Sequence, residues 1–279
     1  MKNYAYISLI ATNNYIGAAI TMMEAWKQTK SEYPFYLMVT ENITSENRNI
    51  LEVLGYKLIN IEEWRPTIYD KQKSSITNND VLLWHGTDKE SRGWQHVFSK
   101  LLCWNLTQFD RVCFIDIDVL LFKNIDDVFD LVTPAWLGPD VNGFSASQIF
   151  VIEPNKTVFN KLIEFAENMK GNDQILFTDE EILHNFFKTE VEFNKTIPLT
   201  YIYNWDRCST DFTFIEDSFN IRGIHMTGTD KPWLHNRDYV KNFTIEWYPA
   251  AFIWNYYISI YNLGVTKLNQ KGFNLPLIS

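Results

Sequence analysis

Positive charge is scarce in this chain. Of its 279 residues, 25 are Lys or Arg and 34 are Asp or Glu, so the formal net charge is -9. A protein that binds nucleic acid by neutralising phosphates needs the opposite balance, and we therefore expect no nucleic-acid partner. Long hydrophobic runs are also scarce. The apolar stretch at residues 4–11 is too short for a secretory signal or a membrane span.

Cysteine is the third scarce feature. Cys103, Cys113 and Cys208 form an odd set without the close spacing of metal ligands. Cys113 lies in an apolar run and Cys103 in a helical pattern, which favours buried free thiols in a reducing compartment. We therefore expect a cytoplasmic protein without a transmembrane segment. A hydrophobic content of 46% with 16% aromatic residues indicates a globular chain with a sizeable core.

Strand and helix patterns alternate at the start of the chain. The strands are expected at residues 4–11, 35–39 and 56–61, and the helices at residues 15–30 and 45–54, the second capped by Ser45. This order predicts an α/β fold with a parallel sheet of nucleotide-binding type, whose ligands gather at the carboxyl ends of the strands. The irregular stretch at residues 62–93 is typical of a lid or a binding loop.

Further elements are predicted after this stretch. They are helices at residues 99–106, 157–169 and 175–187, and strands at residues 112–122, 135–138, 148–152 and 221–226. The aromatic stretch at residues 247–258 carries almost no charge, which favours a helix packed on the core or on a dimer partner. Association with a membrane surface is the alternative.

Two carboxylates interrupt the apolar run at residues 112–122. Asp116 and Asp118 are separated by Ile117, and a strand would send both carboxylates to the same side. Paired oxygen ligands suit a hard divalent ion such as Mg²⁺ or Mn²⁺, which in turn suits a substrate phosphate. An ordinary turn at the end of a strand is the alternative for so short a pattern.

Several motifs follow one another in the order of a known family. They are residues 99–109, 114–118, 124–130 and 150–154, the pair Asp173 and Gln174, and residues 225–233. Over residues 4–235 the chain resembles the glycogenin-like members of glycosyltransferase family 8. The resemblance implies a single GT-A (Rossmann-like) α/β domain over residues 1–235, with a mostly parallel central sheet flanked by helices. Residues 236–279 would then form an aromatic-rich C-terminal extension.

The resemblance also implies a UDP-sugar donor and a Mn²⁺ ion, with Mg²⁺ as a substitute. Asp116 and Asp118 match the metal-binding pair, and His225 matches the third protein ligand. Lys231 matches the cation at the phosphates, where the metal acts as a Lewis acid. Gly228 would let the backbone approach the phosphate closely.

The other donor contacts are implied in the same way. The nucleotide would be held by a turn after the first strand and by an arginine, and the sugar by residues on both sides of the metal pair. The residues are Thr12, Asn13, Tyr15 and Arg92 for the nucleotide, Ser147 and Gln148 beside the donor sugar, Lys100 near the donor sugar and phosphates, and Asp173 and Gln174 near the anomeric carbon.

Two departures from the family pattern bear on specificity. Ala146, Ser147 and Gln148 stand where the family has Asn-Ser-Gly, so the donor sugar is left open, with glucose and galactose as the expected hexoses. Residues 205–212 contain no tyrosine at the place where glycogenin is self-glucosylated. We therefore do not expect self-glucosylation of that kind.

Together these patterns predict a metal-dependent, retaining hexosyltransferase that uses a UDP-sugar. The acceptor is a saccharide, a protein or a lipid-linked glycan, and a homodimer would give the aromatic tail a partner. A haloacid-dehalogenase-like phosphatase is the first alternative, because its aspartyl nucleophile also sits in an Asp-x-Asp at a strand end. That motif normally opens its domain, however, and residues 225–233 would have no role. A nucleotide-sugar-binding protein with a decayed site is the second alternative, suggested by Ala146 and Gln148.

Overall fold

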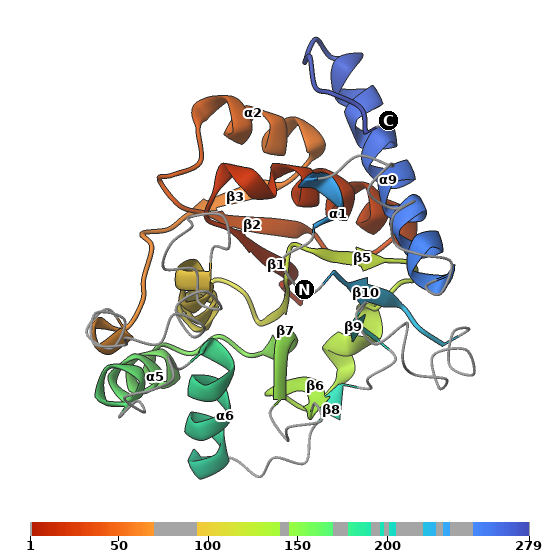
Figure 1. Ribbon diagram of the computed structural model, residues 1–279. Coiled ribbons are helices and arrows are strands. Elements are labelled where there is room, and N and C mark those ends of the chain that lie inside the picture. Colours follow the sequence, from red (N-terminus) through yellow and green to blue (C-terminus); the bar gives the residue numbers. More distant parts are fainter. Residues whose placement is uncertain are drawn as a thin grey trace, which may run out of the picture.

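The computed structural model describes residues 2–69, 94–139, 145–169, 178–190, 196–197, 201–204, 220–226, 231–234 and 248–278. A seven-stranded sheet with the order β3-β2-β1-β4-β7-β6-β8 lies at its centre (Figure 1). Strands β3, β2, β1 and β4 are parallel to one another, and β7 is antiparallel to β4 and β6. The bounds are β1 Tyr4–Ile10, β2 Phe35–Val39, β3 Lys57–Asn60, β4 Arg111–Ile115, β6 Ala135–Pro139, β7 Ser145–Ile152 and β8 Thr196–Ile197. The mostly parallel α/β sheet predicted from the sequence is confirmed.

Helices cover both faces of this sheet (Figure 1). Helices α1, α2 and α9 contribute to one hydrophobic cluster, and α5, α6 and the 3₁₀ helix η3 to the other. The period of two along β1 supplies both, since Tyr4, Tyr6 and Ile10 join the first cluster and Ala5 and Ile7 the second. The bounds are α1 Ile16–Thr29, α2 Ser45–Leu54, η3 Trp94–Asn105, α5 Lys156–Asn168, α6 Asp179–Glu190 and α9 Tyr248–Asn269.

A second, three-stranded sheet has the order β5-β10-β9. Its strands are β5 Val119–Leu121, β9 Tyr203–Asn204 and β10 Gly223–His225. The single strand predicted at residues 112–122 is therefore wrong, because the chain leaves the large sheet after β4 and enters the small one at β5. The amide of Asp116 donates to Gln148 of β7 (2.9 Å), whereas the carbonyl of Asp118 accepts from Met226 after β10 (2.9 Å). The two carboxylates thus lie in the turn between the sheets, where Asp116 is partly exposed and Asp118 is buried.

Two helix starts and one helix cap differ from the sequence prediction. The helix expected from residue 99 is a 3₁₀ helix that begins at Trp94. Thr44, rather than Ser45, caps α2 by accepting from the amide of Asn47 (3.3 Å). Helix α6 begins at Asp179 instead of residue 175, because Thr178 and Glu181 bond each other's backbone amides as a capping box (2.9 and 3.3 Å).

Helix α9 packs along α1. A Cβ on Gly264 of α9 would lie 2.5 Å from Cγ2 of Ile20, so only glycine allows this close approach. Lys267 forms an ion pair with the buried carboxylate of Glu24. Trp254 and Tyr257 are buried in the first hydrophobic cluster. None of the helices within the described ranges is long and apolar enough to cross a membrane.

Candidate functional site

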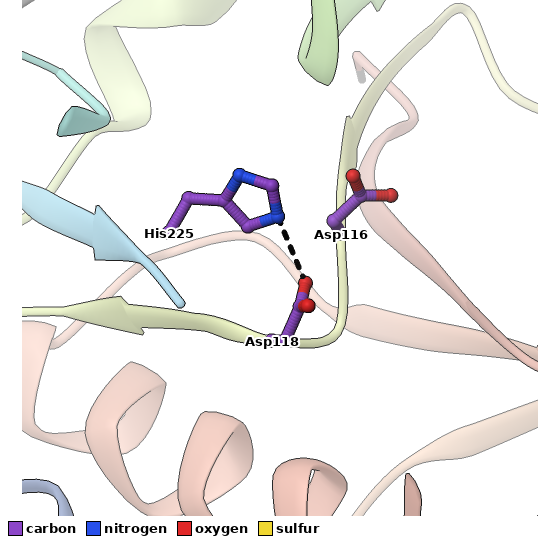
Figure 2. A group of neighbouring side chains, drawn as sticks. All are labelled: Asp116, Asp118 and His225. Carbon is purple, nitrogen blue, oxygen red and sulfur yellow. Dashed lines mark ion pairs between the residues drawn. The ribbon is translucent and has the colours of Figure 1, made fainter. Parts of the chain in front are cut away.

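The turn between β4 and β5 brings three potential metal ligands together. Side-chain ligand atoms of Asp116, Asp118 and His225 all lie within 4.8 Å of one another. In Figure 2 the imidazole reaches over from β10, and its Nε2 stands 3.2 Å from Oδ1 of Asp118. Two carboxylate oxygens and one imidazole nitrogen suit a divalent cation such as Mn²⁺ or Mg²⁺. The turn that carries the two carboxylates is held by backbone hydrogen bonds to Gln148 and Met226. The donor set therefore fits the ion expected from the sequence.

Lys231 contacts the carboxylate oxygen of Asp118 that is not the one nearest His225. Its Nζ is 2.6 Å from Oδ2 of Asp118 and donates a second hydrogen bond to the carbonyl of Met226 (2.5 Å). Burial favours a raised pKa for Asp118, but Lys231 and His225 outweigh burial and hold the pKa of Asp118 well below its usual range. Asp118 is therefore ionised at any physiological pH.

Lys100 of η3 lies on the side of Asp116. The residue is 3% exposed, and its ammonium contacts Asp116 (3.1 Å), Asp179 (3.0 Å) and the hydroxyl of Ser147 (3.1 Å). Burial favours a lowered pKa for Lys100, but the two carboxylates raise the pKa above its usual value. Burial raises the pKa of Asp116. Lys100 opposes this effect, and the negative charge of Asp118 adds to it.

Asp179 and Glu180, at the start of α6, belong to this cluster but were not selected from the sequence. The Ser147 hydroxyl donates to Asp179 (2.7 Å), and the Ser147 amide donates to Glu180 (3.1 Å). Burial and the neighbouring Asp179 raise the pKa of Glu180 to about 7. The capping box of Thr178 and Glu181 is the sequence signal that locates them, because it starts the helix at residue 179 and so places both acids in its first turn.

The turn after β1 forms the 3₁₀ helix η1, Asn13–Tyr15. The Asn13 amide group donates to the carbonyl of Asn42 (3.0 Å) and accepts from Thr44 (3.2 Å) and Asn47 (2.7 Å). These bonds use the Asn13 side chain to tie the turn to the start of α2. Burial raises the pKa of Tyr15, and the negative charges of Asp118 and Asp116 raise it further.

Trp233 joins this turn to the segment of Lys231. Its indole N–H donates to the carbonyl of Asn14 (2.8 Å), and its ring centroid lies 5.4 Å from that of Tyr15. On the other side it stacks on Tyr257 of α9, with centroids 5.8 Å apart. A Cβ on Gly17 would come within 2.6 Å of Cβ of Trp233. The segment of Lys231 and the turn after β1 are therefore packed together through the indole of Trp233.

The remaining expected site residues are placed as follows. Ser147 and Gln148 are buried at the start of β7, beside the turn between β4 and β5. Thr12 precedes η1. Some expectations fall outside the described residues, so they stay predictions. They are Arg92, Asp173, Gln174 and Gly228, the loop at residues 70–93, Cys208, and the tyrosine-free segment at residues 205–212.

The fold and the site together define a class. An acidic turn and a histidine lie at the carboxyl edge of a mostly parallel sheet with two lysines beside them, and this set of groups suits a divalent ion together with an anionic ligand such as a nucleotide diphosphate. Residues 6–137 match the model of glycosyl transferase family 8. The chain is 32% identical over 260 residues to protein R707 of Acanthamoeba polyphaga mimivirus, across 84% of this chain and 83% of that protein. The chain belongs to glycosyl transferase family 8.

Other relatives and a solved structure agree with this assignment. Human glycogenin-1 is 25% identical over 249 residues, which are 85% of this chain and 64% of glycogenin-1. An Arabidopsis thaliana protein, UDP-glucuronate:xylan alpha-glucuronosyltransferase 2, is 24% identical over 254 residues, 88% of this chain and 38% of that protein. The chain thus spans less than two thirds of these two relatives. The glycosyltransferase GlyE of Streptococcus pneumoniae has a TM-score of 0.55 at 18% identity, covering 100% of this chain and 66% of GlyE, and the shared fold is GT-A.

Proposed function

We propose that this chain is a metal-dependent, retaining glycosyltransferase that moves a hexose, glucose or galactose, from a UDP-sugar to an acceptor. The observation that carries the proposal is the cluster of Asp116, Asp118 and His225 with Lys231 bonded to its central carboxylate. Of the two non-transferase alternatives, the phosphatase assigns no role to His225 or Lys231. The decayed-site alternative conflicts with an intact set of metal ligands.

Asp116, Asp118 and His225 would hold the ion, with Mn²⁺ as our first choice and Mg²⁺ as the second. When bound, the metal supplies Lewis-acid stabilisation of the oxygens of the departing diphosphate. Lys231 adds a fixed positive charge at the same place. An ammonium has three N–H donors, and within the described residues two of them go to Asp118 and Met226, so one is left for a phosphate oxygen.

The nucleotide would lie at the turn after β1. Tyr15 offers an aromatic face there, and Thr12 lies between the end of β1 at Ile10 and the start of η1. Asn13 shapes this turn, since its side chain is bonded to the start of α2. We further propose Arg92 and Gly228 as contacts to the nucleotide and the phosphates.

The sugar would lie beyond the metal, near Lys100, Ser147 and Gln148. Lys100 would orient the donor sugar at the end that is bonded to the diphosphate, because its ammonium is fixed between Asp116 and Asp179. Asp173 and Gln174 are proposed from the family pattern as the pair near the anomeric carbon. Retention of the anomeric configuration is tested by NMR of the first product formed.

The test is UDP release from each common UDP-sugar, measured with and without Mn²⁺. We expect slow, metal-dependent hydrolysis of at least one UDP-hexose, faster transfer when an acceptor is supplied, and no turnover by Asp118→Ala. Asp130→Ala is the matched control, since Asp130 is an exposed acid on η4, Asp126–Asp130, away from the site. Cleavage of p-nitrophenyl phosphate without UDP release would support the phosphatase. Binding of UDP with Mn²⁺ but no turnover with any acceptor would support the decayed site.

A cytoplasmic location and a homodimer remain part of the proposal. Cys103 and Cys113 are buried free thiols, and burial raises the pKa of both, so they are unreactive and suit a reducing compartment. Cell fractionation tests the location. Light scattering after size-exclusion chromatography tests the homodimer.

A further inference from the structure

Three carboxylates surround one ammonium at the start of β7. Lys100 contacts Asp116 (3.1 Å) and Asp179 (3.0 Å), and Glu180 accepts from the backbone of Ser147 beside them (3.1 Å). Asp116 also belongs to the metal cluster. Within the described residues, the charge of Lys100 is thus shared by two acids, and the group as a whole is acidic.

The order of the strands places this acidic group along the path of the donor. Strands β1, β4 and β7 are neighbours in the sheet. At the same edge, β1 is followed by the turn with Tyr15, β4 is followed by the turn with Asp116 and Asp118, and β7 begins near Ser147. The amide of Asp116 donates to the carbonyl of Gln148 (2.9 Å), so β7 lies directly beside the turn with Asp116 and Asp118. A donor with its base at β1 and its diphosphate at β4 therefore extends its sugar toward Asp179 and Glu180.

The hydrogen-bonding character of this group is that of an acceptor. Above its pKa of about 7 the Glu180 carboxyl is ionised, and an ionised carboxylate accepts hydrogen bonds and cannot donate them. The Ser147 hydroxyl already donates its one proton to Asp179 (2.7 Å). The hydroxyl groups of a neutral hexose are donors that match such oxygens, and these bonds are charge-assisted. The carboxylate of a uronic acid offers only further acceptors and a charge of the same sign, which is an unfavourable juxtaposition.

We propose that Asp179 and Glu180 line the subsite of the donor sugar and select neutral hexoses against uronic acids. The proposal rests on the proposed function, and it names the substrate class of that same site. It assigns to two residues at the start of α6 a specificity role that the sequence motifs did not suggest. Glu180 carries most of the discrimination, because Asp179 is already neutralised in part by Lys100.

The experiment measures binding as well as turnover, in the presence of Mn²⁺, for UDP, UDP-glucose, UDP-galactose and UDP-glucuronate. In the wild-type protein we expect one of the UDP-hexoses to bind at least ~10-fold more tightly than UDP-glucuronate, with the same order in kcat/KM. In Glu180→Gln the difference should shrink to about threefold or less, mainly through tighter binding of UDP-glucuronate, because the substitution removes the charge and keeps an oxygen for the Ser147 amide. Asp179→Asn is a second test, and it should shift the ratio in the same direction by a smaller factor.

Glu164→Gln is the matched control, since Glu164 is an exposed acid on α5. It should leave the ratio unchanged, and thermal melting of each variant reports whether the fold is intact. Equal affinity of wild type for UDP-hexoses and UDP-glucuronate, with normal binding of UDP, would overturn this proposal and leave the proposed function standing. An unchanged ratio in a folded Glu180→Gln would do the same. If UDP itself does not bind with Mn²⁺, both proposals fail together.

Discussion

Lys231 and Asp118 are 113 positions apart in the sequence, yet their charged groups are 2.6 Å apart. This ion pair connects the turn after β4 to the segment after β10, and it is buried on both sides. The same carboxylate lies 3.2 Å from His225 on its other oxygen. Asp118 is therefore the central residue of the cluster, with Lys231 on one carboxylate oxygen and His225 on the other.

Replacing Lys231 by Met should slow UDP-sugar turnover by at least ~100-fold, because the variant loses a fixed positive charge at the leaving diphosphate. Lys231→Arg should retain more activity, since it keeps the charge with a different geometry. Steady-state UDP release measures both, and Gln28→Ala on the exposed face of α1 serves as the control. Wild-type rates in Lys231→Met would contradict a role for this lysine at the phosphates.

Metal binding should be visible without any substrate. After removal of metal with a chelator, added Mn²⁺ should raise the melting temperature, since an ion that binds only the folded state stabilises it by about 2.7 kcal/mol at 100 times its Kd. His225→Ala should lose most of this increase, whereas Asp130→Ala should keep it. A wild-type melting temperature that does not respond to Mn²⁺ or Mg²⁺ would remove the basis for the metal site.

Lys100→Met should destabilise the fold even though it introduces an apolar side chain of similar length. The variant leaves the carboxylates of Asp116 and Asp179 buried without their shared cation, which costs about 3 kcal/mol or more in free energy of unfolding. The double variant Lys100→Met with Asp179→Asn should recover part of the loss, because one of the two charges is then absent. Urea denaturation measures all three proteins, and equal midpoints for wild type and Lys100→Met would show that the cluster contributes nothing.

The choice between hexose and uronic acid should depend on pH. Burial and Asp179 raise the pKa of Glu180 to about 7, so this carboxyl is ionised above that pH and neutral below it. The preference for UDP-hexose over UDP-glucuronate should therefore be largest at about pH 8 and should fall toward about pH 6, where the uronate is still ionised. In Glu180→Gln the ratio should be flat over this range. A ratio that rises as the pH falls would contradict the sign of this effect.

Gly17→Ala should impair the site through packing. The new methyl group would meet Cβ of Trp233 at 2.6 Å, so the indole has to move, and with it the segment of Lys231. We expect a loss of about 1–3 kcal/mol in stability together with a lower rate of turnover at saturating donor. Gln28→Ala on the same helix controls for helix substitution. Full activity in Gly17→Ala would mean that the position of Trp233 does not matter.

Local patterns predicted most of the elements, including β1, β2, α2, α5 and β7, because each has a clear period and a turn or cap at its ends. The single strand predicted at residues 112–122 was wrong, since its residues other than Asp116 and Asp118 are all apolar and no local pattern shows that a chain changes sheets. Asp116 and Asp118 nevertheless lie at the point where the chain passes from the large sheet to the small one. The start of α6 was misplaced for a related reason: a polar turn before residue 175 resembled a cap, while the capping box lies at Thr178.

In the candidate site, too, some residues could be predicted from local sequence motifs and others depend on tertiary packing. Asp116, Asp118, His225, Lys231, Lys100 and Ser147 were all selected from the sequence, and the fold brings them together. The contribution of Asp179 and Glu180 depends on how α6 is placed against β7, which is a tertiary relationship. Asn13 was expected to contact the nucleotide, but its side chain is bonded to Asn42, Thr44 and Asn47, and these partners lie about 30 positions further along the chain.

The stacking of Trp233 on Tyr257 has a consequence for synthesis on the ribosome. Asp116, Asp118 and His225 are all made before residue 257, so the ligands for the ion are present in the growing chain well before α9 emerges. The indole that joins the Lys231 segment to the turn after β1 gains its second aromatic support only when Tyr257 folds back onto it. A nascent chain stopped between residues 234 and 257 would therefore carry Asp116, Asp118, His225 and Lys231 while Trp233 still lacks its contact with Tyr257, so translation of α9 completes the packing beside the candidate site.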